Sequence, residues 1–196
     1  MEIRVFTVGS YRTNCYMAWC DGSDSCIVID PGYEPEYLLE QLRLLRKTPA
    51  AILLTHGHFD HVGGVKAMAA ETGCPVYIHK GDTSLNPRLT GGEVYHTHTY
   101  DDGDTLELAG LTIRVLHTPG HTPGCVCLLS EDVMFAGDTL FAGTCGRTDL
   151  PYSDPSQMRT SLNRLAALEG NYQVLPGHGH GSTLDVERKT NPFLQL

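Results

Sequence analysis

The sequence predicts an α/β fold, a four-layer αββα sandwich in which two β-sheets pack face to face with helices on their outer faces. Short β-rich runs bounded by glycine, serine or asparagine recur in both halves of the chain, as expected for the strands of packed sheets. Each half also holds stretches whose apolar residues recur at helical spacing. With 196 residues, 41% of them hydrophobic, the chain can bury a full core, and we expect a single domain over residues 1–196.

The first half is expected to begin with an antiparallel meander. β-rich runs separated by turn residues predict strands at residues 2–8, 15–19 and 26–30. From Glu34 to Lys47 leucines recur at helical spacing, with acidic residues early and basic residues late, as the helix dipole favours. The pattern then predicts a strand at 50–55, a helix at 65–71 and a strand at 75–79.

The second half follows a segment without a clear pattern. Residues 80–103 contain Pro87, several glycines and scattered histidines and aspartates, and we expect a loop with one helical turn. Beyond this segment, the pattern predicts one helix at 157–168 and strands at 105–108, 112–117, 125–129, 133–136 and 173–175.

The charge balance argues against a nucleic-acid partner. The chain carries 14 Lys and Arg against 23 Asp and Glu, a formal net charge of -9, and so lacks the basic field that attracts phosphate backbones. No stretch approaches the roughly 20 apolar residues that span a bilayer, and the N-terminal residues lack an export-signal pattern. We therefore expect a cytoplasmic protein without membrane contact, with its seven cysteines reduced. The oligomeric state is not defined by the sequence.

Candidate metal ligands cluster directly after the predicted strand at 50–55, namely His56, His58, Asp60 and His61. Later strands are followed by His121, by Asp138 and by either His178 or His180. Glycine or proline stands beside each, so the backbone can pass close to the ligands and four strand ends can converge on one edge of the sandwich. A lone histidine is more often structural, and we assign His79, His96 and His98 to that class, although the last two could line the site. The cluster as a whole predicts a metal centre.

The donor set is sufficient for two ions. His56 and His58, two residues apart on extended backbone, point the same way and can hold one ion, whereas Asp60 and His61 lie past the bend and can reach a neighbouring one. Imidazole and carboxylate ligands suit zinc, iron or manganese, and the lack of cysteine in the cluster argues against a closed structural zinc site. With the three later candidates there are seven ligands, enough for two ions bridged by Asp138 with a position open for water.

The motifs THGHFDH, TPGHTPG, AGDTLF and LPGHG, found between residues 55 and 179, resemble the metallo-β-lactamase superfamily and follow its order. The resemblance implies that the first metal is bound by His56, His58 and His121, the second by Asp60, His61 and His178, and that Asp138 is shared. It selects His178 over His180 as the ligand. It also extends to the stretch 29–32 (IDPG), where it implies that Asp30 supports the metal ligands from behind.

Within that superfamily the sequence is most similar to glyoxalase II, the hydroxyacylglutathione hydrolases, and to their short bacterial relatives. The similarity includes the stretches 13–16 (TNCY), 145–149 (CGRTD) and 188–193 (RKTNPF). It implies hydrolysis of a small-molecule thioester, such as S-lactoylglutathione, by a hydroxide bridging two divalent transition metal ions, with zinc expected first and iron or manganese as alternatives. Asp60 would orient this nucleophile while ligating. Arg147 is the candidate for binding an anionic part of the substrate, and His180, which replaces a tyrosine of that family, is a second candidate contact.

Other reactions stay open on the same motifs. Persulfide dioxygenases, which oxidise glutathione persulfide at a single iron, resemble this chain at 145–149, but the complete seven-ligand set favours two metals. Lactonases and β-lactamases share the metal ligands, although a periplasmic lactam hydrolase is expected to carry an export signal. A binding protein that has lost catalysis would lack ligands, and every ligand position is filled.

Overall fold

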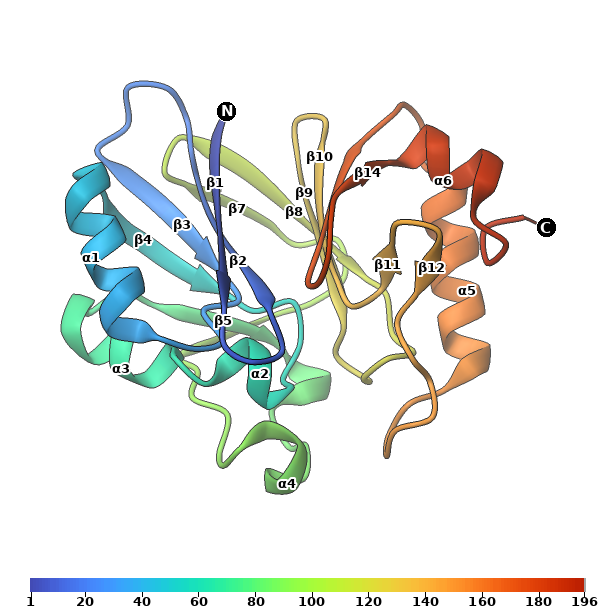
Figure 1. The fold of residues 1–196 in the computed structure, drawn as a ribbon, viewed down its shortest axis with the longest axis horizontal. Coiled ribbons are helices and arrows are strands. Elements are labelled where there is room, and N and C mark those ends of the chain that lie inside the picture. The colour runs from blue at the N-terminus through green and yellow to red at the C-terminus, as the bar shows by residue number, and fades with distance from the viewer. Residues whose placement is uncertain (196) are drawn as a thin grey trace.

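Two six-stranded sheets organise the molecule (Figure 1), and the computed structural model describes residues 1–195. The first sheet has the strand order β1-β2-β3-β4-β5-β6. It is antiparallel from β1 to β3, which confirms the predicted meander, and parallel from β3 to β6. Its strands are β1 (Glu2–Val8), β2 (Thr13–Trp19), β3 (Ser25–Ile29), β4 (Thr48–Leu53), β5 (Val76–His79) and β6 (His98–Tyr100).

The second sheet has the order β14-β13-β10-β9-β8-β7 and is antiparallel except for the neighbours β10 and β13. Parallel neighbours need a crossover connection, and the connection here includes α5 (Pro155–Ala166). The strands are β7 (Thr105–Leu108), β8 (Leu111–His117), β9 (Val126–Ser130), β10 (Val133–Gly137), β13 (Gln173–Pro176) and β14 (Ser182–Thr183). A small separate hairpin pairs β11 (Leu140–Phe141) with β12 (Thr144–Cys145).

Helices cover the outer face of each sheet. α1 (Pro35–Leu45) and α3 (Val65–Thr72) lie outside the first sheet, while α5 and α6 (Leu184–Thr190) lie outside the second (Figure 1). The short helices α2 (Phe59–Val62), η1 (Lys80–Asp82) and α4 (Pro87–Thr90) belong to the connections. The predicted α/β fold with four αββα layers is therefore confirmed.

The central strands β9 and β10 of the second sheet are buried on both faces because they are covered on both sides. On β10, Phe135 belongs to the core between the two sheets, whereas Met134 belongs to the cluster that includes Met158 of α5. On β9, Leu128 and Leu129 divide in the same way. Successive side chains of a strand point to opposite faces, so a central strand between two layers carries apolar residues on both faces.

The prediction for residues 80–103 is wrong in one respect. Instead of a loop with one helical turn, the segment contains η1, α4 and the strand β6, which pairs in parallel with β5. Only Tyr100 of the three β6 residues is buried, so no alternation marks this strand in the sequence. The other predicted elements are present with ends shifted by up to two residues, while α2, α6, β11, β12 and β14 have no counterpart in the prediction.

Two further features concern the cysteines and the length of the helices. All seven cysteines are free, as expected for reduced thiols. Across residues 1–195, no helix combines the length and the apolar character needed to cross a membrane.

Candidate metal centre

The carboxyl ends of four strands meet at one edge of the sandwich. β4 leads into the segment 54–58, and β8, β10 and β13 lead to His121, Asp138 and His178. Because β10 and β13 are parallel neighbours, their carboxyl ends share an edge of the sheet. The convergence of strand ends predicted from the sequence is therefore present in the fold.

Two glycines allow this close approach. Gly137 has a φ of +48°, and a Cβ there would lie 2.4 Å from Thr55 Oγ1. A Cβ on Gly177 would lie 2.3 Å from Asp138 Oδ1 and 2.7 Å from His61 Cε1. Any side chain at either position would push apart the segments that carry the candidate ligands.

Six of the seven predicted ligands come together in two adjoining groups. Donor atoms of the first group lie within 4.8 Å of one another, and so do those of the second. We call these groups the first subsite (His56, His58, His121) and the second subsite (Asp60, His61, His178). Six of the seven side chains are buried, and only His178 is partly open to solvent, at 27% exposure.

Asp138 lies between the two subsites. Its Oδ2 is 3.5 Å from His121 Nε2 of the first subsite and 3.6 Å from His178 Nε2 of the second. Its Oδ1 is 3.5 Å from His61 Nε2. A carboxylate in this position can reach ions in both subsites.

Three polar atoms at this junction have no protein partner. His56 Nε2, His58 Nε2 and Asp138 Oδ1 are buried without a hydrogen bond, and Ser130 Oγ is the only other such side-chain atom within residues 1–195. Leaving a buried polar atom unpaired costs about 1–3 kcal/mol. All three atoms belong to candidate ligands, and a cation satisfies lone pairs on both nitrogen and oxygen.

Protein acceptors hold three of the imidazole rings in place. The Nδ1–H groups donate as follows: His61 to Asp30 Oδ2 at 2.9 Å, His121 to the backbone carbonyl of Arg147 at 2.8 Å, and His178 to that of Tyr11 at 3.1 Å. Carbonyl and carboxylate oxygens only accept, so each Nδ1 must carry its hydrogen. When each ring is neutral, its lone pair therefore lies on Nε2, the atom that faces the neighbouring ligands.

Asp30 ties the second subsite to the end of β4. Besides His61, its carboxylate accepts hydrogen bonds from the backbone nitrogen of Thr55 at 2.7 Å and from Thr55 Oγ1 at 2.5 Å. Asp30 is buried and contacts the second subsite through Nδ1 of His61. This contact fits the supporting role that the resemblance implied.

The nitrogen separations fit ligands of shared ions. His61 Nε2 and His178 Nε2 lie 3.3 Å apart. Two nitrogens bound at about 2.1 Å to a tetrahedral ion are about 3.4 Å apart. His58 Nδ1 and His121 Nε2 lie 2.9 Å apart, a hydrogen-bond distance that a shared proton supports in the metal-free state. The residues present therefore fit divalent transition metal ions.

The two subsites differ in their protonation. Burial, followed by the neighbouring His121, lowers the pKa of His58 to about 4. Burial also acts to lower the pKa of His61, but the carboxylates of Asp138 and Asp30 outweigh it and raise this pKa to about 9. In the metal-free protein at pH 7, His58 is therefore neutral while His61 keeps its proton.

Asp60 is ionised at the edge of the second subsite. Burial alone would raise its pKa, but the hydrogen bond with His178 and the charge of His61 outweigh burial and hold the pKa below its usual value. Its Oδ2 lies 3.2 Å from His178 Nε2 and accepts a hydrogen bond from Thr13 Oγ1 at 3.3 Å. Such a carboxylate can ligate a cation and accept a hydrogen bond from water.

The model of the metallo-beta-lactamase superfamily matches residues 8–182. The chain belongs to the metallo-β-lactamase superfamily. A curated relative, hydroxyacylglutathione hydrolase GloC of Haemophilus influenzae, is 32% identical over 99% of this chain and 98% of its own length.

Solved structures of superfamily members share the fold. BLEG-1 B3 metallo-β-lactamase aligns with a TM-score of 0.90 at 36% identity, covering 100% of both chains. TTHA1623 in a di-iron-bound form has a TM-score of 0.85 at 39% identity, over 97% of this chain and 100% of its own. ETHE1 from Myxococcus xanthus has a TM-score of 0.85 at 28% identity, over 98% of this chain and 84% of its own. The chain thus has a metallo-hydrolase fold with a histidine and aspartate cluster suited to divalent metals.

The two substrate contacts predicted from the superfamily resemblance lie outside the ligand groups. The exposed side chain of Arg147 pairs with Asp149, through Nε at 2.6 Å and Nη2 at 2.9 Å. Only its backbone carbonyl reaches a ligand, His121. His180 is exposed, two residues beyond His178. Both contacts therefore stay predictions.

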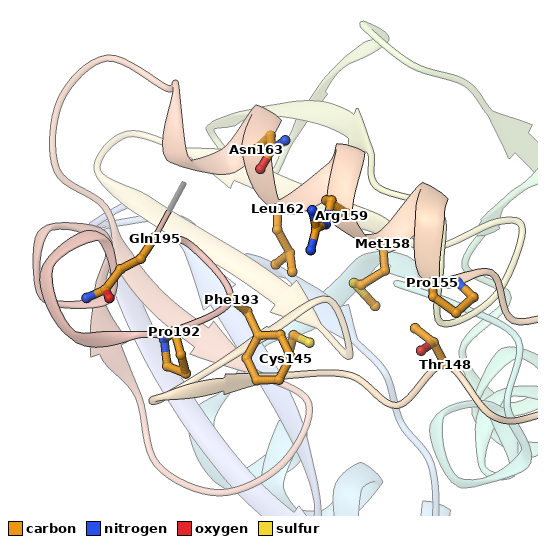
Figure 2. A pocket seen from close by; sticks show the side chains of 10 residues that line it. All are labelled: Cys145, Thr148, Pro155, Met158, Arg159, Leu162, Asn163, Pro192, Phe193 and Gln195. Atoms are coloured by element: carbon orange, nitrogen blue, oxygen red, sulfur yellow. The ribbon is translucent and has the colours of Figure 1, made fainter.

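A cavity of about 600 Å³ lies next to the Arg147 segment (Figure 2). Cys145 and Thr148 border it from one side, Met158 and Leu162 of α5 from another, and Phe193 from the C-terminal segment. None of the seven candidate ligands lines this cavity. The cavity is therefore separate from the two subsites.

The three histidines assigned to structural roles lie apart from the ligand groups. His79 stacks on His117 with ring centroids 4.0 Å apart, and His98 stacks on Tyr77 at 4.8 Å. His96 Nδ1 lies 2.9 Å from the carbonyl of Val94. None of the three belongs to a potential metal-binding group within the described residues.

Sequence reasoning missed two residues that hold the ligand loops. Asp82 is fully buried and accepts hydrogen bonds from Gly57 and Thr122, neighbours of the first-subsite ligands. Asn14 donates to the loop that carries His178. A signal existed for Asp82, because it follows the predicted strand at 75–79 just as the candidate ligands follow their strands.

Proposed function

We propose that this protein is a binuclear metallohydrolase that cleaves thioesters of the S-lactoylglutathione class. The observation that carries the proposal is the complete donor set, two subsites of three ligands each with Asp138 between them. The full-length similarity to hydroxyacylglutathione hydrolase GloC supports the substrate class.

The residues of this chain have separate roles in the proposed reaction. Divalent ions in the subsites would lower the pKa of a water molecule to roughly 7 and place positive charge beside the developing oxyanion. The Asp60 carboxylate, fixed by Thr13 Oγ1, would orient that water toward the thioester carbonyl. The Nδ1 hydrogen bonds of His61, His121 and His178 would keep each Nε2 directed at its subsite.

The sulfur leaving group can depart without a proton from the protein. A thiol with a reference pKa of about 8.5 departs as thiolate, so no dedicated general acid is required. Arg147 would bind an anionic part of the substrate after exchanging its partner Asp149, and His180 would border the same side.

We propose zinc as the resident metal, with iron and manganese as alternatives. Five imidazoles with two carboxylates suit any of the three ions. The similar protein TTHA1623 is known in a di-iron-bound form, so metal analysis of protein prepared in zinc-only and iron-only media is the direct comparison.

The test is release of free thiol from S-lactoylglutathione by metal-loaded protein. Thiol release that Asp60→Asn lowers by about 100-fold or more would support the proposal. Asp102→Asn, which changes a carboxylate paired with Arg164 outside the subsites, serves as the matched control and should retain activity. Failure of the loaded protein to release thiol from any glutathione thioester would overturn the proposal.

A second candidate is oxidation of glutathione persulfide. It is favoured by the likeness to ETHE1 and by the stretch 145–149. Oxygen consumption with glutathione persulfide, without thiol release from thioesters, would establish it instead. A chromogenic cephalosporin belongs in the same panel because of the likeness to BLEG-1.

A further inference from the structure

The two subsites are each assembled from both sheets, so something must fix the sheets relative to each other at this edge. The ligands His56, His58, Asp60 and His61 come from the first sheet, and His121, Asp138 and His178 come from the second. A shift of about 1 Å between the sheets would be enough to disrupt the ligand geometry.

Asp82 connects the loops of the first subsite. It ends η1, directly after β5 of the first sheet. Its Oδ2 accepts hydrogen bonds from the Gly57 nitrogen at 2.7 Å and from Thr122 Oγ1 at 2.7 Å, and its Oδ1 accepts from the Gly124 nitrogen at 2.6 Å. Gly57 lies between two ligands of the first sheet, and Thr122 is next to the ligand of the second. We call this set of contacts the Asp82 link.

The Asp82 link joins segments next to the candidate ligands. Its carboxylate is fully buried, and burial acts to raise its pKa, so keeping it charged is costly unless its hydrogen bonds are complete. All three donors belong to segments that carry or flank ligands. Burying a carboxylate costs free energy, and two loops whose separation did not matter would not need such a link.

A different residue connects the loops of the second subsite. Asn14 on β2 donates through Nδ2 to the carbonyls of Pro176 at 3.1 Å and Gly179 at 2.9 Å, on either side of His178. The backbone nitrogen of Asn14 donates to Gly177 at 2.8 Å, and Tyr16 Oη donates to Pro176 at 2.7 Å. We call this set the Asn14 link.

We propose that Asp82 and Asn14 are positioning residues, each responsible for one metal subsite. Asp82 sets the distance between His58 and His121, and Asn14 sets the position of His178 against Asp60 and His61. This inference rests on the proposed two-metal centre but not on its substrate. It gives a function to Asn14 of the TNCY stretch and to Asp82 after β5, neither of which is a candidate ligand.

Asp82→Asn breaks the Asp82 link whichever way the new amide turns. The two backbone donors, Gly57 and Gly124, bond to different oxygens of Asp82, so one of them must face an NH₂ group that cannot accept. Asn14→Leu removes both side-chain donors of the Asn14 link at similar volume. Each variant therefore disturbs one link and leaves the other intact.

Glu187 provides a matched control. It is also a buried carboxylate with three donors, the Gly143 nitrogen at 2.8 Å, Asn191 Nδ2 at 2.8 Å and Ser182 Oγ, but it contacts no candidate ligand. Glu187→Gln repeats the chemical change of Asp82→Asn at a site that only joins α6 to its surroundings.

The experiment measures zinc affinity by competition with a chelator. His178→Ala leaves only the first subsite and His121→Ala leaves only the second, so each link is tested on a single bound ion. In the His178→Ala protein, Asp82→Asn should weaken zinc binding by about 10- to 100-fold, and Asn14→Leu should change it by less than about twofold. In the His121→Ala protein, Asn14→Leu should weaken zinc binding by about 10- to 100-fold, and Asp82→Asn should change it by less than about twofold. Glu187→Gln should lower the thermal midpoint without changing either affinity.

Several results would overturn the inference. Asp82→Asn could weaken zinc binding equally at both subsites. Asp82→Asn and Asn14→Leu could both leave it unchanged, or Glu187→Gln could weaken it as much as Asp82→Asn does. If Asp82→Asn does not fold, Thr122→Val removes one bond of the Asp82 link and should weaken only the first-subsite ion. A wild-type protein that binds a single ion would also contradict the pairing. Thiol release is not measured, so failure of the thioester proposal is a separate outcome.

Discussion

The first and second subsites offer similar candidate ligands but in different electrostatic surroundings. The first consists of three buried histidines, and burial lowers the pKa of His58 to about 4. The second contains Asp60 and has Asp30 behind it, and the carboxylates raise the pKa of His61 to about 9 despite its burial. The second subsite is also more open, through the partly exposed His178.

This difference separates two ways of preparing a metal site. The first subsite has no carboxylate of its own, and His56 Nε2 and His58 Nε2 are buried without a partner, so its drive to bind a cation is the lack of any other partner for these atoms. The second subsite offers negative charge and holds protons when no ion is bound. Asp138 touches both, and therefore couples two subsites with different responses to pH.

The largest expected effect comes from removing that coupling residue. Asp138→Ala should lose tight binding of both ions and more than about 100-fold of the activity, beyond the range for residues that only support a ligand. Elemental analysis after dialysis against a chelator, with thiol release on the same sample, checks it. A variant that kept both ions and full activity would show that Asp138 does not join the subsites.

Single-histidine variants should separate the subsites. His121→Ala should release the first ion and His178→Ala the second, leaving about one equivalent in each case. Elemental analysis checks the stoichiometry, and Glu187→Gln, which contacts neither subsite, should keep both equivalents. If either histidine variant lost both ions, the subsites would be one cooperative unit.

A smaller effect is expected for the residue behind the second subsite. Asp30→Asn keeps the shape but offers His61 and Thr55 a poorer acceptor. The second ion should bind about 10- to 100-fold more weakly, as is typical when an outer partner is lost, while the first ion is unaffected. Chelator competition in the His121→Ala background measures this affinity. An unchanged affinity would show that Asp30 does not support the second subsite.

The smallest effect is a difference in pH dependence. His61 must lose its proton before Nε2 can ligate, and its pKa in the metal-free protein is about 9. Below pH 9 the affinity for the second ion should therefore fall by about tenfold per pH unit, whereas His58, with a pKa of about 4, stays deprotonated through this range. Titration calorimetry in buffers of different ionisation enthalpy should detect proton release at pH 8 only for the second ion. Equal release for both would contradict the comparison.

The ligands of both subsites were predictable because their signal is local. His56, His58, Asp60 and His61 occur within six residues, and each later candidate directly follows a β-rich run. The supporting contacts were not local. Asp82 bonds to Thr122, 40 positions away, and Asn14 to Gly179, 165 positions away, so only the packing of two sheets reveals them.

The fold was predictable where apolar periodicity is strong. α1 and α5 present buried leucines at helical spacing, and β9 and β10 are buried at every position and mostly apolar. β6 and α2 lack such a signal. β6 is a strand because β5 lies beside it, and α2 is a single turn that carries Asp60 and His61, too short for periodicity to detect.

We expect thioester hydrolysis to require an ion in each of the two subsites. The most direct test of this requirement is the rate of thiol release from S-lactoylglutathione as zinc is added stepwise to metal-free protein at pH 8. We expect little activity up to one equivalent, a rise between one and two equivalents, and a plateau at two. Full activity at one equivalent, or no thiol release at two, would contradict it.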